Sequence, residues 1–138
     1  MTIAILQYGT HCAGTIGAIG NNGKGVTSVN RDPNKFKFYI EKALNNNGYG
    51  SCFGLMQAID RCHTNGAKVI SMSLGGCPFA ESENQIFKKI YDDNVLLVAA
   101  AGNNGYTTKS YPASYPVVMS VAAVDDKENR ASFSQYNE

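Results

Sequence analysis

The spacing of apolar residues predicts a helix near the middle of the chain. From position 52 onward these residues return every three or four positions, which is the period of one helix face. The members of this stripe are Cys52, Leu55, Met56, Ile59 and Cys62. Ser51 can cap the first turn and Gly66 lies just beyond the last one, and both residue types are preferred at those positions.

The remaining apolar segments predict a second helix and four strands. The helix spans 81–93, and its inner face would carry Ile86, Phe87 and Ile90. Apolar and polar residues alternate over 36–44, which favours a strand, and 67–73 and 117–123 have strand-like patterns as well. The run VLLVAAA at 95–101 is continuously apolar, as expected of a parallel strand that is buried on both faces.

The order strand, helix, strand, helix, strand, strand predicts an α/β fold. Such an order implies a parallel sheet with right-handed crossovers and helices packed on its faces. Stretches rich in Asn and Gly, typical of turns, punctuate it at 20–25, 45–50, 65–67 and 102–105. Binding sites in these sheets form at the carboxyl ends of the strands, here the glycine-rich segments after 73 and after 101.

Length and charge narrow the classes of partner. The 138 residues are 43% hydrophobic and carry a formal net charge of +1, which predicts a single globular domain over 1–138. A charge so near zero gives no electrostatic basis for binding nucleic acid or an anionic membrane, so neither is expected as a partner. The start, MTIAILQYG, lacks the basic region and cleavage site of a signal peptide.

The four cysteines, Cys12, Cys52, Cys62 and Cys77, do not have the spacing of a metal site. Four cysteines allow three disulfide connectivities, and the sequence does not choose among them. We favour the interpretation that all four are free, buried thiols that pack as small apolar side chains.

A phosphate-binding loop is one hypothesis for the glycine-rich segment 17–25. A Walker A motif needs Gly, four residues, and then Gly-Lys-Ser/Thr. Here Ala18 stands at the first position and Gly25 replaces the hydroxyl residue that would bind magnesium. The segment therefore does not predict nucleotide binding.

Five stretches, taken in order, match the signature segments of one enzyme family. They are GTHCAGTIGA (9–18), SMSLGG (71–76), VAAAGNNG (98–105), YPASYPVVMSVAAVD (111–125) and RASFSQY (130–136). In these residues the chain resembles the subtilisin-like serine proteases (the subtilase, or S8-type, family). The cysteine at position 12 resembles the proteinase K-like branch of that family. The resemblance implies a three-layer α/β fold with a mostly parallel sheet and helices on both faces, truncated at both ends.

The resemblance also implies roles for individual residues. Asn103 would donate its side-chain N–H to the oxygen that gains charge in the tetrahedral intermediate. Tyr8 stands at the position of the general-base histidine, where a phenol that stays protonated at neutral pH cannot act as His does. The substrate-binding residues implied are Leu44, Gly48, Gly50, Ser73, Leu74, Gly75, Gly76, Ala100, Ala101 and Gly102. The glycines at 48 and 50 would pair with substrate backbone as an added strand, and the others would line side-chain pockets.

The rest of the catalytic apparatus is not recognised in these residues. The family's reaction needs Asp, His and Ser, but no acidic residue precedes Tyr8 and no G-T-S-M-A nucleophile motif occurs. We therefore expect an inactive chain. No cofactor or metal is expected either, because Asn22 alone falls near a position of the family's calcium site. His11, the second histidine of the motif, is expected to be a buried scaffold residue.

Three interpretations of function stay open. The chain is a partial, silent segment of a serine endopeptidase, a pseudoprotease that binds a peptide or a protease, or an unrelated α/β binding module. The first two imply a peptide or protein ligand, and exposed apolar surface would favour self-association. The family is commonly secreted, but this chain carries no export signal that would fix its compartment.

Overall fold

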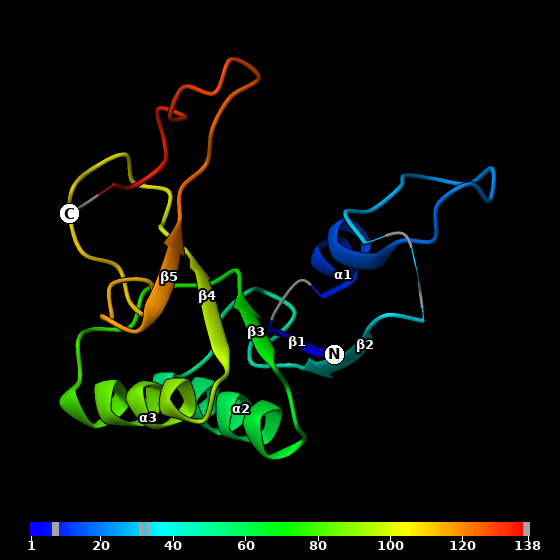
Figure 1. Ribbon diagram of the computed structural model, residues 1–138. Coiled ribbons are helices and arrows are strands. Elements are labelled where there is room, and N and C mark those ends of the chain that lie inside the picture. Colours follow the sequence, from blue (N-terminus) through cyan, green and yellow to red (C-terminus); the bar gives the residue numbers. More distant parts are fainter. Residues whose placement is uncertain (7–8, 31, 33, 137–138) are drawn as a thin grey trace. The chain divides into compact units, whose positions relative to one another are not determined.

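The computed structural model describes residues 1–6, 9–30, 32 and 34–136, which form two compact units, Met1–Ser71 and Met72–Glu138 (Figure 1). The first unit contains β1 (Thr2–Leu6), α1 (Gly9–Gly17), β2 (Lys37–Glu41), α2 (Cys52–Thr64) and β3 (Val69–Met72), which ends at the unit boundary. The second unit contains α3 (Glu81–Asp92), β4 (Leu96–Ala100) and β5 (Val118–Val121).

The first unit is a layered α/β structure with the strand order β2-β1-β3. β1 and β2 run parallel, and Leu6 lies opposite Glu41 in their register. Phe36 and Phe38 pack against α1, in a cluster that includes Cys12, Ala13 and Ile16. Glu41, three residues after Phe38 in the same strand, bonds instead to Arg61 of α2. Because successive strand residues point to opposite faces, α1 and α2 cover opposite faces of this sheet, which confirms the predicted layers.

α2 forms as its sequence pattern predicts. The Oγ of Ser51 accepts a hydrogen bond from the N–H of Gly54 at 3.0 Å, so the first turn is capped. Gly66, just past the helix, has a φ of +78°, a left-handed conformation that glycine adopts at little cost. The buried residues of the helix are Leu55, Met56, Ala58, Ile59 and Cys62.

The second unit pairs β4 with β5 in parallel and packs α3 against β4. The prediction that Ile86 lies on the inner face of α3 is wrong, since this side chain is exposed. Glu83 is buried instead, together with Phe87 and Ile90. The physical reason is a hydrogen bond of 3.0 Å that the Tyr115 hydroxyl donates to Oε2 of Glu83. This bond satisfies a carboxyl group inside the unit, so an acidic residue can occupy the inner face.

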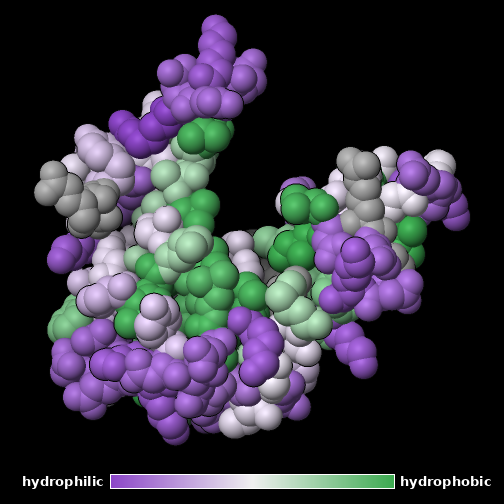
Figure 2. Space-filling view, in the orientation of Figure 1, coloured by the Kyte–Doolittle hydropathy of each residue, from purple (hydrophilic) through white to green (hydrophobic). Residues whose placement is uncertain are grey.

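The prediction that 95–101 is buried on both faces is also wrong for this unit. Leu97 and Ala99 are buried, whereas Leu96 and Ala100 are exposed, which is the alternation of a strand covered on one side. Figure 2 shows apolar surface over β4 and β5, where Leu96, Met119 and Val121 are exposed.

One further expectation needs correction, and one strand was missed. His11 is exposed, because α1 turns Cys12, Ala13 and Ile16 toward Phe36 and leaves His11 on another side. β1 was not predicted from MTIAILQ; a run this short has no pattern that separates a strand from other apolar segments. Among the described residues, no helix has the length and apolar character needed to cross a bilayer.

The cysteines divide into two states. Cys12 and Cys62 are in the reduced thiol form, and burial raises the pKa of Cys62 to about 12. Cys52 and Cys77 are disulfide-bonded. The interpretation as four free thiols is therefore wrong for these two, because spacing along the chain does not show which cysteines are oxidised.

Candidate functional site

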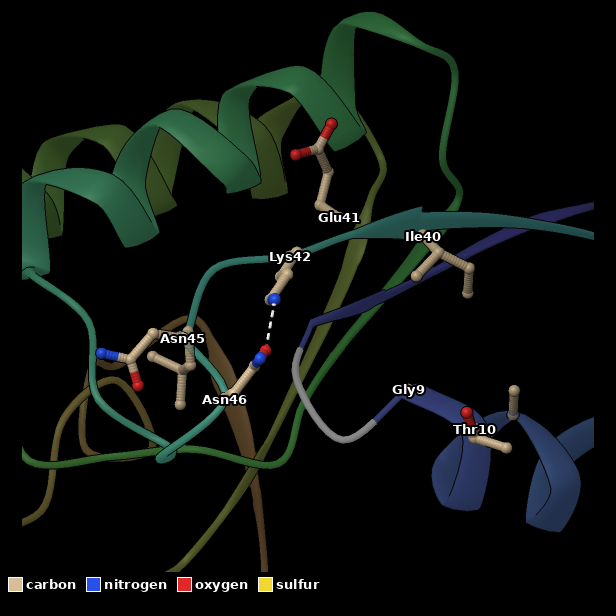
Figure 3. Close-up of a pocket in the computed structure, with 9 residues that line it drawn as sticks. Gly9, Thr10, Ile40, Glu41, Lys42, Asn45 and Asn46 are labelled. Atoms are coloured by element: carbon tan, nitrogen blue, oxygen red, sulfur yellow. Dashed lines mark hydrogen bonds between the residues drawn. The ribbon is translucent and has the colours of Figure 1, made fainter.

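A pocket of about 530 Å³ lies in the first unit, between the start of α1 and the segment that follows β2 (Figure 3). Its lining residues are Gly9, Thr10, Ala13, Ile40, Glu41, Lys42, Leu44, Asn45 and Asn46. Leu44, predicted to line an outer substrate pocket, is thus in the wall of a real cavity. In Figure 3, Ile40 points to the side of Thr10, whereas Glu41 points the other way. The pocket therefore lies on the α1 face of the sheet.

The loop beside this pocket is organised by Asn45. Its side-chain Oδ1 accepts hydrogen bonds from the backbone N–H groups of Asn47 at 2.9 Å and Tyr49 at 3.1 Å. Its backbone N–H donates to the carbonyl of Tyr49, and its carbonyl accepts from Gly48. Four bonds from one residue fold 45–49 into a compact turn. The sequence showed only a turn signal here and gave no indication of this role.

Both glycines of the predicted substrate edge are required by the backbone itself. Gly48 has a φ of +82°, in the left-handed region. A Cβ on Gly50 would lie 2.5 Å from the carbonyl oxygen of Ala43 and 2.6 Å from Cδ2 of Leu44. Gly50 therefore packs directly on Leu44, which lines the pocket, and Gly48 lies in the turn between these two residues.

A charged pair holds the end of β2 on its other face. Glu41 accepts hydrogen bonds from Arg61 and from the Tyr39 hydroxyl. The bond from Arg61 is the main cause that lowers the pKa of the Glu41 carboxyl, against the opposing effect of burial. The bond to Glu41 raises the pKa of Tyr39 in turn. These contacts fix the point from which the 42–50 segment departs.

In the second unit, the segment that follows β3 has no regular secondary structure and contains Ser73, Leu74, Gly75 and Gly76. The Gly76 N–H donates to the carbonyl of Tyr111 at 3.2 Å, and Gly76 has a φ of +113°. A Cβ on Gly75 would come within 2.9 Å of the Ser110 Oγ. The segment thus rests on residues 110–111. A side chain at Gly75 would disturb that contact, whereas a Cβ on Gly76 would meet nothing within 4 Å and would be disfavoured only by the positive φ.

The loop after β4 carries the predicted oxyanion donor. Ala100 ends the strand, and the Ala101 N–H donates to the carbonyl of Val121 at 3.0 Å. Gly102 has a φ of +113°, and Asn103 next to it is exposed. The loop therefore presents the Asn103 side chain to solvent directly beyond the carboxyl end of a parallel strand, where sites of α/β sheets form.

The predicted residues that the structure describes fall into two groups, one in each unit. Tyr8 lies outside the described residues. Asn22, which the resemblance placed near a calcium ligand position, is exposed, and its Oδ1 accepts from the backbone N–H of Lys24. The absence of a calcium site stays a prediction.

Comparison with known proteins identifies the class to which this fold and these segments belong. The model of the Subtilase family matches residues 6–138. Subtilisin DY of Bacillus licheniformis is 42% identical over an alignment of 131 residues that covers 92% of this chain and 46% of that protein. Thermitase of Thermoactinomyces vulgaris is 36% identical over 129 residues, 94% of this chain and 45% of thermitase.

A solved structure supports the same family and fold. The psychrophilic subtilisin-like protease Apa1 from the Antarctic psychrotroph Pseudoalteromonas sp. AS-11 superposes with a TM-score of 0.91 at 38% identity, covering 99% of this chain and 39% of Apa1. The chain belongs to the subtilase family. It spans less than half the length of the subtilases named here. The predicted family and the subtilisin-like α/β fold are confirmed, whereas the similarity of Cys12 to the proteinase K-like branch stays a prediction.

Proposed function

We propose that this chain forms the peptide-binding part of a subtilisin-like serine endopeptidase. Leu44 lines a pocket for a substrate side chain, and the backbone of Gly48 and Gly50 pairs with extended substrate. Ser73–Gly76 and Ala100–Gly102 supply the walls of the pocket for the residue before the scissile bond. The observation that carries the proposal is the family match over 6–138, together with the pocket that Leu44 lines.

Asn103 is the proposed oxyanion donor. Its side-chain N–H would bond to the carbonyl oxygen as that oxygen gains charge, so the interaction is stronger in the transition state than in the bound substrate. Removal of the corresponding donor from a subtilisin costs about 2.7–4 kcal/mol of transition-state stabilisation. The exposure of Asn103 beyond β4 is consistent with a group that meets substrate.

We further propose that the 138 residues bind peptides without hydrolysing them. An acyl-transfer mechanism of this family requires a base and a nucleophile, and Tyr8 stands in place of the base. Whether the natural polypeptide is a longer protease or a pseudoprotease depends on its size. The pseudoprotease is favoured by a sequence that keeps the pocket segments but has Tyr8 in place of the base. Membership of the family removes the support for an unrelated α/β module.

The proposal includes no metal, nucleic acid or membrane partner. It does include self-association, because Leu96, Met119 and Val121 expose apolar surface over β4 and β5 in the second unit. Apolar patches of this kind commonly mark contact surfaces.

Peptide binding tests the proposal. Fluorescence anisotropy would be measured with a labelled tetrapeptide, Leu-Ala-Pro-Phe, in two forms that differ only at the C-terminus, a free carboxylate and an amide. We expect saturable binding with a micromolar Kd. The same peptide built from D-amino acids is the control, since its side chains would not meet the same pockets while its backbone pairs as a strand. Absence of saturable binding by both L-peptides would overturn the proposal. The mass of the native polypeptide, compared with that of the 138 residues, separates the protease from the pseudoprotease.

A further inference from the structure

The segment 133–136 runs along the loop that carries Asn103, within the second unit. The Gln135 N–H donates to the carbonyl of Gly102 at 3.0 Å, and the Gly105 N–H donates to the carbonyl of Phe133 at 2.7 Å. A third backbone bond joins the Tyr136 N–H to the carbonyl of Tyr106. The loop from 102 to 106 is therefore bonded on both sides of Asn103.

Gln135 adds a side-chain contact that spans this loop. The residue is only 5% exposed, and its Nε2 donates to the carbonyl of Thr108 at 2.6 Å. Its side chain also occupies the space where a Cβ on Gly102 would stand. One residue thus bonds at 102 through its backbone and at 108 through its amide, and it packs beneath the glycine that precedes Asn103.

The segment is itself well anchored. The Oγ of Ser134, which is buried, accepts from the Ala123 N–H at 2.9 Å. A nitrogen of Arg130 donates to the carbonyl of Ser134 at 2.6 Å. Gln135 is therefore attached to the region after β5, so it can hold the Asn103 loop against a fixed support.

We infer that Gln135 is a positioning residue for Asn103: it fixes the Gly102–Thr108 loop so that the Asn103 amide is aimed at the oxygen of a bound peptide. The inference rests on the proposed function, because it assigns Gln135 a purpose only if Asn103 meets that oxygen. It acts through Asn103 and does not itself touch substrate.

The ratio of the affinity for the carboxylate peptide to the affinity for the amide peptide measures how well the Asn103 amide is oriented. A product-like peptide places a charged oxygen where the oxyanion develops, whereas the C-terminal amide offers a neutral one. A hydrogen bond to a charged group is the stronger of the two, so we expect the wild-type chain to bind the carboxylate peptide about tenfold more tightly than the amide. Asn103→Ala should reduce this ratio to about one.

Gln135→Met keeps the volume of the side chain and removes the N–H donor. We expect it to reduce the carboxylate-to-amide ratio to about one while the amide peptide binds as in wild type. A change confined to the charged oxygen would not result from general loss of structure. Gln135→Glu serves as a second variant at pH 7.5, since an ionised carboxylate cannot donate to Thr108. Gln85→Met, at an exposed position of α3, is the matched control and should keep the wild-type ratio.

The outcomes separate the two ideas. Binding of both peptides by wild type, with the same carboxylate preference in the Gln135 variants, would overturn the role of Gln135 alone. Absence of binding to either peptide by wild type would overturn the proposed function and this inference with it. Loss of the ratio in Gln135→Met, with the ratio kept in Gln85→Met, supports the inference.

Discussion

Oε2 of Glu41, at the end of β2, lies 3.0 Å from both Nε and a terminal nitrogen of Arg61 in the last turn of α2. The pair joins a strand to a helix 20 residues further along the chain. It also lies where the chain leaves β2 and enters segment 42–50, part of which lines the pocket. The pair links the stability of the first unit to the position of the residues proposed to bind peptide.

We predict that Glu41→Gln weakens the pH dependence of unfolding. The pKa of Glu41 is lowered below 4.5 in the folded chain, chiefly by Arg61. A lowered folded-state pKa gives stability that is present above the unfolded-state value and is lost as the pH falls through the folded-state value. The variant should therefore melt below wild type at pH 7, and the difference should shrink as the pH falls below about 4.5.

Thermal unfolding followed by circular dichroism between pH 7 and pH 3 checks this prediction. Asp60→Asn, an exposed position on the same helix, is the control and should leave the shape of the pH profile unchanged. A constant difference between Glu41→Gln and wild type across the whole range would contradict the stated mechanism.

A second prediction concerns Gly50→Ala. The new Cβ would overlap the Ala43 carbonyl and the Leu44 side chain, so the loop must shift and Leu44 must leave its place in the pocket wall. Such overpacking typically costs ~1–3 kcal/mol, and we expect peptide affinity to fall on the order of tenfold. Gly14→Ala is the matched control, since a Cβ there meets nothing within 4 Å. In the middle of α1 this change should stabilise the chain by ~0.5–1 kcal/mol. Equal Kd values for Gly50→Ala and wild type would show that Leu44 keeps its place.

Much of the fold could be predicted because local and long-range requirements agree in α2 and β2. The stripe from Leu55 to Cys62 is buried and Ser51 caps the helix, as spacing alone implied. The prediction for Ile86 was wrong because helical periodicity assigns side chains to the inner face of a helix by their polarity alone. It cannot detect that Tyr115, 32 residues from Glu83, provides a partner for a buried carboxyl group.

Some residues of the candidate site could be named from the sequence, and others could not. The structure places Leu44 in the wall of a cavity, and its role as a substrate-binding residue, which came from a family resemblance, stays a prediction. Asn45 and Gln135 were missed, since their roles consist of bonds to backbone groups, and a sequence pattern carries no signal for them. The contact from Gln135 to Thr108 joins residues 27 positions apart, so only the folded chain reveals it.

The buried bond between Tyr115 and Glu83 gives a third prediction. Tyr115 is 1% exposed, and burial is the main reason that its pKa is raised to about 12, so its hydroxyl is a donor at all ordinary pH values. Tyr115→Phe leaves the Glu83 Oε2 without this donor. We expect a loss of ~1–3 kcal/mol, the cost of an unsatisfied buried acceptor. Urea unfolding measures it, with Tyr91→Phe, at an exposed position of α3, as the matched control. Equal midpoints for Tyr115→Phe and the control would mean that the bond adds nothing to stability.

The last prediction concerns Tyr8→His, which restores the residue type of the family's general base. We expect no gain of peptidase activity in the 138-residue chain. A histidine base accelerates acyl transfer only by taking a proton from a nucleophile that it bonds, and an acidic residue must orient it. No acidic residue precedes position 8, and no recognisable nucleophile motif follows in these residues. Turnover of a fluorogenic peptide would be measured for wild type and variant with and without a serine-directed inhibitor. Turnover by Tyr8→His that the inhibitor abolishes would mean that one of the serines in this chain acts as the nucleophile, and the proposal of binding without hydrolysis would then be wrong.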